Sequence, residues 1–119
     1  MLTNAEVTRL LDIANAGVQK GQVALARTVY NGILECRPDH IPTLISLAMS
    51  HLAVGEYDEA ETVLRDKVLA QNPDDPDGLA YLGLNAFLAG RKDEAAEILA
   101  KVPEATPAGN LAKNLLESI

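Results

Sequence analysis

Few side chains in this sequence have the types and spacings that metal or cofactor chemistry needs. His40 and His51 lie eleven residues apart and lack the i, i+4 partner that a metal site on a helix uses. The run 75–78 has part of the spacing of a calcium loop. That loop would, however, place Pro73 at its first ligand position and Leu84 at its last. The sequence therefore predicts no metal site and no cofactor.

Nucleophilic catalysis is not indicated either. The sequence has no Gly-rich phosphate loop, no His-Glu-x-x-His and no nucleophile elbow. Cys36 is the single cysteine, which excludes an intrachain disulfide, and we interpret it as a packed or idle thiol. Nothing in the sequence marks any of the serines Ser46, Ser50 or Ser118 as activated. We expect no catalytic residue and no enzymatic activity.

Composition and charge limit the possible partners. The chain has 119 residues, 48% of them hydrophobic and 3% aromatic, so one domain with an aliphatic core is expected. The net charge is −7, and residues 55–80 hold eight acids against two bases, which disfavours nucleic acid. No apolar run approaches the roughly 18 residues of a membrane span, and the first residues lack a secretory signal. We therefore expect a cytoplasmic protein without membrane insertion.

Three segments of the sequence repeat with a period of 34 or 35 residues. Each has a glycine, an alanine five residues later and a leucine eleven residues earlier. The sets are Gly21, Ala26 and Leu10; Gly55, Ala60 and Leu44; and Gly90, Ala95 and Leu79. Pro38 follows the first glycine by 17 residues and Pro73 follows the second by 18, so the second repeat carries one extra residue.

This pattern resembles the tetratricopeptide repeat over residues 7–103. The signature is best kept in Leu82-Gly83 and in Ala95-x3-Leu99, whereas its aromatic is replaced by Gly17, His51 and Ala86. The resemblance implies an all-α fold, a right-handed α-solenoid of three helix-turn-helix repeats at about 7–40, 41–75 and 76–103. These repeats and a C-terminal capping helix at about 107–119 would form a single domain, 1–119.

The expected helices cover residues 4–19, 22–36, 41–53, 57–71, 76–89, 92–101 and 107–117. The repeated glycines suit the turn inside each hairpin, where a left-handed residue is needed. The repeated alanines let two helices approach closely. The last helix has one apolar stripe, which is typical of a helix that caps a stack. An alternative is that it folds into the groove of its own chain or of a neighbouring chain.

The first helix of each repeat should line the inner face of a curved stack. Residues one place beyond the packing leucines should point there, and we take as candidate groove residues Leu11, Asn15, Ile45, Met49, Leu52, Leu84, Phe87 and Leu88. This mostly apolar set predicts a groove for an amphipathic helix or an extended segment of a protein partner. Alternatively, these side chains thicken the core or are covered by the C-terminal helix.

Comparison within the family limits the class of partner that the groove is expected to bind. Repeat domains that clamp the acidic C-termini of heat-shock chaperones use Lys, Asn and Arg on the inner face. The matching places here hold Leu11, Asn15, Ser46, Asp77 and Tyr81, of which only Asn15 agrees. Residues 43–57 instead resemble the central repeat of the bacterial type III secretion chaperones that hold needle subunits. That resemblance implies a chaperone for a needle or translocator subunit, working with a small co-chaperone.

Two other functions remain open from the sequence. One is a scaffold that binds through the acidic outer surface at Glu56, Asp58, Glu59 and Glu61. The other is a homo-oligomer that associates through its C-terminal helix and has no separate client.

Overall fold

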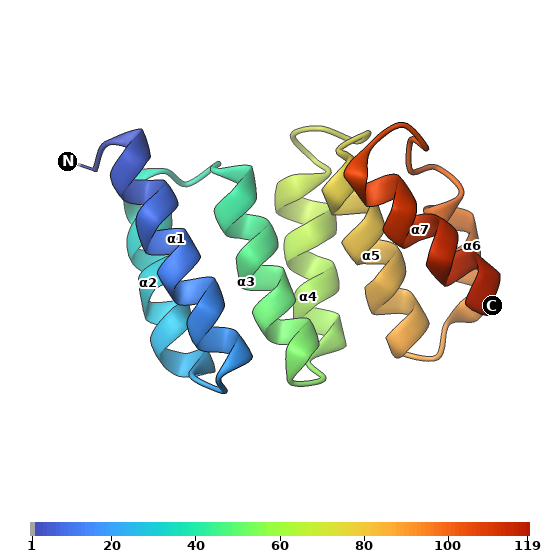
Figure 1. The fold of residues 1–119 in the computed structure, drawn as a ribbon, viewed down its shortest axis with the longest axis horizontal. Coiled ribbons are helices and arrows are strands. Elements are labelled where there is room, and N and C mark those ends of the chain that lie inside the picture. Colours follow the sequence, from blue (N-terminus) through green and yellow to red (C-terminus); the bar gives the residue numbers. More distant parts are fainter. Residues whose placement is uncertain (1) are drawn as a thin grey trace.

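The computed structural model describes residues 2–119, which form a row of antiparallel helices (Figure 1). The elements are α1 (Asn4–Gln19), α2 (Val23–Cys36), α3 (Ile41–Ala53), α4 (Tyr57–Val63), η1 (Leu64–Val68), α5 (Pro76–Leu88), α6 (Lys92–Leu99) and α7 (Pro107–Ser118). No strand occurs in this part of the chain. The predicted all-α fold of three helical hairpins and a C-terminal helix is confirmed.

The turn inside each hairpin is made by a glycine in the left-handed region. Gly21, Gly55 and Gly90 have φ values of 84°, 80° and 87°, and they are the only residues with positive φ in 2–119. A residue with a Cβ would be strained there, which explains the regular spacing of these glycines. The prediction that the repeated glycines form the turn inside each hairpin is confirmed.

The two helices of each hairpin pack closely through small residues. Ala26, Ala60 and Ala95 are at most 2% exposed. In the third hairpin, Gly83 of α5 faces the side chain of Leu99 of α6, and a methyl group on Gly83 would overlap it. Large aliphatic side chains such as those of Leu44, Leu64 and Leu79 fill the space around these contacts.

The first turn of α5 shows how a turn between two repeats is built. Asp75 caps this helix, and its carboxylate accepts a hydrogen bond from the Gly78 amide at 2.7 Å. Pro76 occupies the first turn, where a missing N–H costs little. Together these two residues fix the place at which α5 begins beside α3.

The second helix of the second repeat departs from the predicted range of 57–71. It is α-helical only to Val63 and continues as a π-helical turn, in which the Leu69 amide donates to the Leu64 carbonyl at 2.8 Å. A π-turn takes one more residue than an α-turn. The π-turn therefore takes up one residue more than an α-turn would, and seven residues (69–75) then connect it to α5, against four (37–40) between α2 and α3. The other helices begin and end within two residues of the expected positions.

The C-terminal helix covers the end of the stack. Helix α7 packs against α5 and α6, and within residues 2–119 it makes no contact with α1 or α3 (Figure 1). Its buried residues Ala108 and Ala112 join the core there. The capping role is confirmed, and the alternative that α7 fills the groove of its own chain is wrong.

Candidate functional site

Helices α1, α3 and α5 form a groove on one side of the molecule. It consists of two adjoining hollows of about 490 and 420 Å³. The first is lined by Leu11, Asn15, Ile41, Pro42, Ile45, Ser46, Met49, Asp75, Asp77 and Tyr81. The second is lined by Asn15, Val18, Gln19, Tyr30, Ser46, Met49, Ser50, Leu52, Ala53, Tyr81 and Leu84. Because four residues line both hollows, we treat them as one site, the concave groove.

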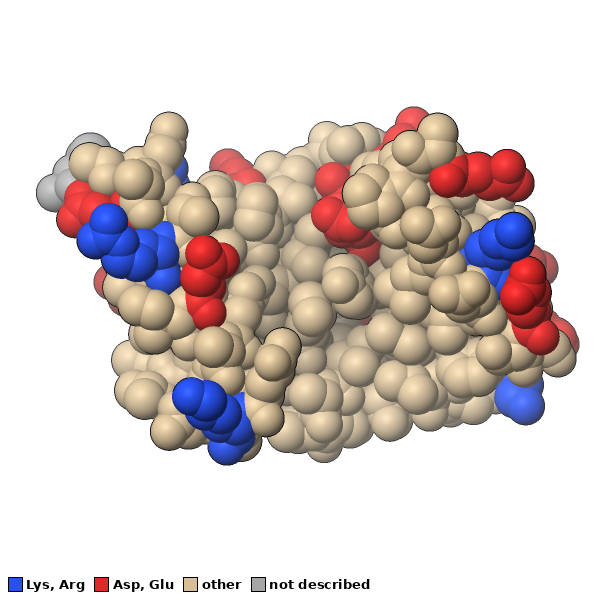
Figure 2. All heavy atoms as spheres, in the orientation of Figure 1, with Lys and Arg blue, Asp and Glu red and all other residues tan. Residues whose placement is uncertain are grey.

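The three helices that form the concave groove have distinct places in it. Helix α3 contacts both α1 and α5 and lies between them (Figure 1). Its residues Ile45 and Ser46 are 8% and 6% exposed and form the floor. Figure 2 shows this face hollowed between α1 and α5, with acidic atoms along the upper edge of the hollow.

Six of the eight candidate groove residues line the concave groove, namely Leu11, Asn15, Ile45, Met49, Leu52 and Leu84. Phe87 and Leu88 line neither hollow. Phe87 packs against the core, and Leu88 is 45% exposed at the end of α5. The second hollow ends at Leu84, one turn before α5 does, so these two side chains lie outside it. That the eight candidate residues bind a partner stays a prediction.

About half of the side chains that line the concave groove are polar, and only some of them have a hydrogen-bond partner. The Tyr30 hydroxyl donates to the Asn15 amide oxygen. The hydroxyls of Ser46 and Tyr81 have no hydrogen-bond partner among the described residues. Burial, helped by the negative charge of Asp77, raises the pKa of Tyr81, so its hydroxyl stays protonated and can donate.

Charge is confined to one end of the concave groove. Asp75 and Asp77, at the N-terminal end of α5, are its only charged lining residues. The opposite end is formed by Val18, Gln19, Leu52 and Leu84 and carries no charge. Both aspartates lie beside Tyr81, which lines both hollows. The sequence analysis named Tyr81 only as one of the positions that bind an acidic C-terminus in other repeat domains. Its four-residue spacing from Asp77 could have shown that the two residues lie on one helix face.

A cluster of charged side chains joins the first repeat to the second beside the concave groove. Arg27 donates to the Ser50 hydroxyl at 3.1 Å, to the Ser50 carbonyl at 3.2 Å and to Glu56 at 2.6 Å. His51 Nδ1 lies 2.9 Å from the same Glu56 oxygen. Hydrogen bonds from His51 and Arg27 lower the pKa of Glu56. These contacts hold α2 against α3.

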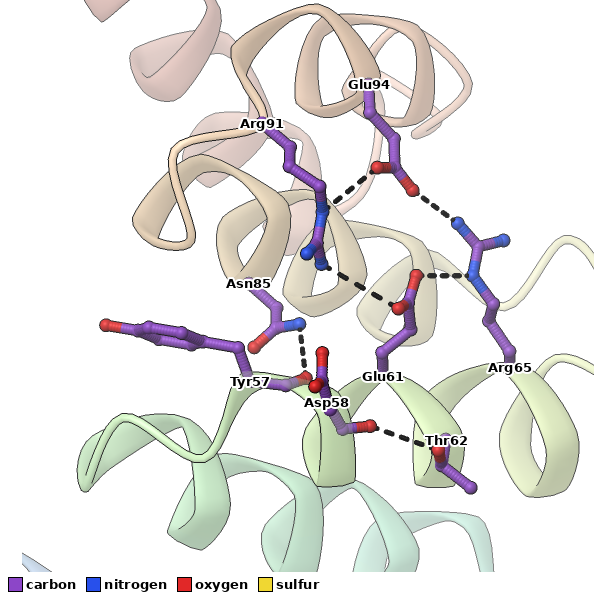
Figure 3. A network of polar contacts seen from close by, with 8 residues as sticks. All are labelled: Tyr57, Asp58, Glu61, Thr62, Arg65, Asn85, Arg91 and Glu94. Carbon is purple, nitrogen blue, oxygen red and sulfur yellow. Dashed lines mark hydrogen bonds and ion pairs between the residues drawn. The ribbon is translucent and has the colours of Figure 1, made fainter.

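A second network joins the second repeat to the third (Figure 3). Arg65 pairs with Glu61 at 2.9 Å and with Glu94 at 2.8 Å. Arg91 lies 3.1 Å from Glu94 and 3.7 Å from Glu61; these are ion pairs rather than well-aligned hydrogen bonds. Glu61, like Glu56, was expected on an acidic docking surface. Both carboxylates instead form ion pairs with arginine side chains of the same chain, which the sequence analysis did not predict.

The family follows from the sequence and the fold together. A tetratricopeptide repeat model matches residues 45–110, more than half of the chain. The chain belongs to the tetratricopeptide repeat family. The crystal structure of the Yersinia enterocolitica type III secretion translocator chaperone SycD (alternative dimer) superposes with a TM-score of 0.80. The match covers 98% of this chain and 92% of that chain at 17% identity, which shows a shared fold. Comparison with curated proteins finds no match.

The five positions at which other tetratricopeptide repeat proteins clamp an acidic terminus come together here. Leu11, Asn15, Ser46, Asp77 and Tyr81 all line the first hollow. The carboxylate of Asp77 would repel a second carboxylate at this end of the groove. That this groove does not clamp an acidic chain terminus stays a prediction.

The rest of the described chain offers little for other chemistry. Residues 2–119 contain no cluster of three His, Cys, Asp or Glu side chains that could hold a metal ion. Cys36 is an exposed free thiol, rather than a packed one. None of the helices described combines the length and the apolar character that crossing a membrane requires.

Proposed function

We propose that this chain is a non-enzymatic protein-binding module whose concave groove receives an amphipathic helix or an extended segment of a partner. The observation that carries the proposal is an open, mainly apolar groove that the chain's own last helix leaves uncovered. Met49 lines both hollows and is 39% exposed, so apolar surface is available to a partner. Methionine also adapts its shape to different partners.

Burial of apolar side chains in the concave groove would supply most of the free energy of binding. An apolar side chain that becomes buried contributes about 1.5–3 kcal/mol. A typical stable interface covers about 800 Å² on each partner. Ordering a flexible segment consumes several kcal/mol of that gain. The affinity therefore depends on how well the segment fits Met49, Leu52 and Leu84.

A chaperone of type III secretion is the specific role that we propose. The fold shared with SycD, which is described as a translocator chaperone, supports it. In that role the chain would act in the bacterial cytoplasm and shield a needle or translocator subunit before export, with a small co-chaperone.

Affinity capture from the bacterial cell tests the proposal. Met49→Asp places a charge in the concave groove, whereas Leu25→Asp places one on α2, where Leu25 is 63% exposed and lies outside the groove. We expect wild type and Leu25→Asp to capture the same partner and Met49→Asp to lose it. Equal capture by all three folded proteins would overturn the proposal.

Binding through the acidic outer surface is the first alternative. Glu56 and Glu61 form ion pairs with arginines of the same chain. Asp58 and Glu59 are therefore the acids of that surface that remain for a partner. Replacing them as Asp58→Asn and Glu59→Gln leaves the repeat contacts intact. Capture that is lost in this variant but kept in Met49→Asp would favour the alternative.

Self-association at the C-terminal end is the second alternative. A hollow of about 630 Å³ lies between α6 and α7, and Leu116 and Ile119 beside it are 37% and 44% exposed. Leu116→Asp changes this surface without removing α7. An oligomer of the wild type that becomes monomeric in this variant during sedimentation would favour self-association.

A further inference from the structure

Resting on the proposed function, we propose that the segment bound in the concave groove carries a Lys or Arg side chain that pairs with Asp77. This places the cation at the end of the groove where α5 begins. The apolar part of the segment lies along α3 toward Leu52 and Leu84. The concave groove then binds the segment in one orientation, because one of its ends is charged and the other is not.

The carboxylate of Asp77 is available to a partner. Asp75 already accepts a hydrogen bond from the Gly78 amide, which it caps. Asp77 is exposed, lines the first hollow, and makes no ion pair or side-chain hydrogen bond within residues 2–119. No Lys or Arg lines either hollow. A cation at this end must therefore come from the occupant.

A polar group deeper in the concave groove is open to an occupant. Ser46 is 6% exposed and lines both hollows, and its hydroxyl makes no hydrogen bond to the described residues. The hydroxyl oxygen is not one of the fully buried atoms that lack a partner, so it is accessible from the groove, and a polar atom of a bound segment can replace water there. Ser46 lies on the floor between the Asp77 end and the uncharged end.

The charge of the whole chain acts in the same direction. The net charge is −7, and the acidic edge of the hollow is visible in Figure 2. A basic segment is therefore attracted before it docks, whereas an acidic one is repelled. The contact with Asp77 then decides which end of the segment lies at the start of α5.

Selection from a phage-displayed library of random 16-residue peptides provides the ligands for a test. The library is panned on the full chain, and groove binders are those lost with Met49→Asp and kept with Leu25→Asp. We expect the groove binders to share a stretch of apolar residues with Lys or Arg at one end. One such peptide is then synthesised with its basic residue and with Gln in that place.

A double-mutant cycle then measures the contact itself. Replacing the peptide's basic residue by Gln should weaken binding to the wild type about two- to fivefold. The same replacement should change binding to Asp77→Asn less than about twofold, and the wild-type effect should shrink in high salt. Asp74→Asn is the matched control, because Asp74 is an exposed acid of the same turn that lines neither hollow.

The outcomes separate the two proposals. Groove binders without a basic residue, or a peptide replacement that affects wild type and Asp77→Asn equally, would overturn the pairing with Asp77 and leave groove binding intact. A selection that yields no binder sensitive to Met49→Asp would overturn both.

Discussion

Among single residues, two helical glycines have opposite surroundings. A Cβ on Gly83 would overlap the Leu99 side chain, whereas a Cβ on Gly32 meets nothing within 4 Å. We expect Gly83→Ala to lower the free energy of unfolding by about 1–3 kcal/mol, because the two helices must separate. Gly32→Ala should raise it by about 0.5–1 kcal/mol, because alanine favours the helix. Urea denaturation measures both, and a stabilising Gly83→Ala would contradict the close packing.

The stability contribution of Glu56 depends on pH. Its pKa is lowered from 4.5 by hydrogen bonds from His51 and Arg27, so protons bind more readily to the unfolded chain. The contribution is complete above about pH 4.5 and is lost as the pH falls through the lower folded value. Wild type should therefore unfold at higher urea than Glu56→Gln at pH 7, and the difference should vanish in acid.

Glu59→Gln is the control for this effect, because Glu59 is exposed and makes no ion pair among the described residues. Its unfolding midpoint should follow that of the wild type at every pH. A gap between wild type and Glu56→Gln that stays constant down to pH 3 would show that the Glu56 contacts do not form.

Among the elements, the π-helical turn makes a prediction about deletions. If the turn holds one surplus residue, deletion of the exposed Asp66 should restore an α-turn and keep both flanks in register. Deletion of Thr28 from the regular helix α2 should rotate every later residue of that helix by about 100°. We expect the first variant to unfold cooperatively, with a free energy of unfolding within about 1 kcal/mol of that of the wild type. The second variant should be severely destabilised. Circular dichroism during denaturation distinguishes them.

The hairpins could be predicted from sequence because their determinants are local. A glycine at each turn and an alanine five residues later fix where one helix ends and how closely the next one packs. The π-turn could not be placed in this way. The spacing from Gly55 to Pro73 revealed one extra residue, but a loop or a helix can hold it, and only packing against α3 and α5 decides.

The concave groove was predicted in part for a related reason. Helical periodicity identifies the face on which Leu11, Met49 and Leu84 lie, and these residues do line the groove. Periodicity does not say where along a helix a hollow ends, which is why Phe87 and Leu88 lie outside both hollows. Three ion pairs join residues far apart in the sequence and gave no local signal, namely Arg27–Glu56, Arg65–Glu94 and Arg91–Glu61.

For the whole molecule, the terminal helix should be necessary for stability. Helix α7 buries Ala108 and Ala112 against the last hairpin, where Leu99 and Val102 are at most 6% exposed. We expect a chain that ends at Ala105 to lose about 3 kcal/mol or more of unfolding free energy and to bind a hydrophobic dye. Unchanged stability and no dye binding would show that α7 does not complete the core.

Site-specific photo-crosslinking in the native cell tests most directly whether the concave groove is the binding surface. A photoreactive phenylalanine analogue replaces Met49 or Leu52 in the groove, or Leu25 on the outer helix α2, in otherwise identical chains. We predict a crosslink to a partner protein from both groove positions and none from Leu25. A crosslink from Leu25 together with none from Met49 and Leu52 would contradict the assignment.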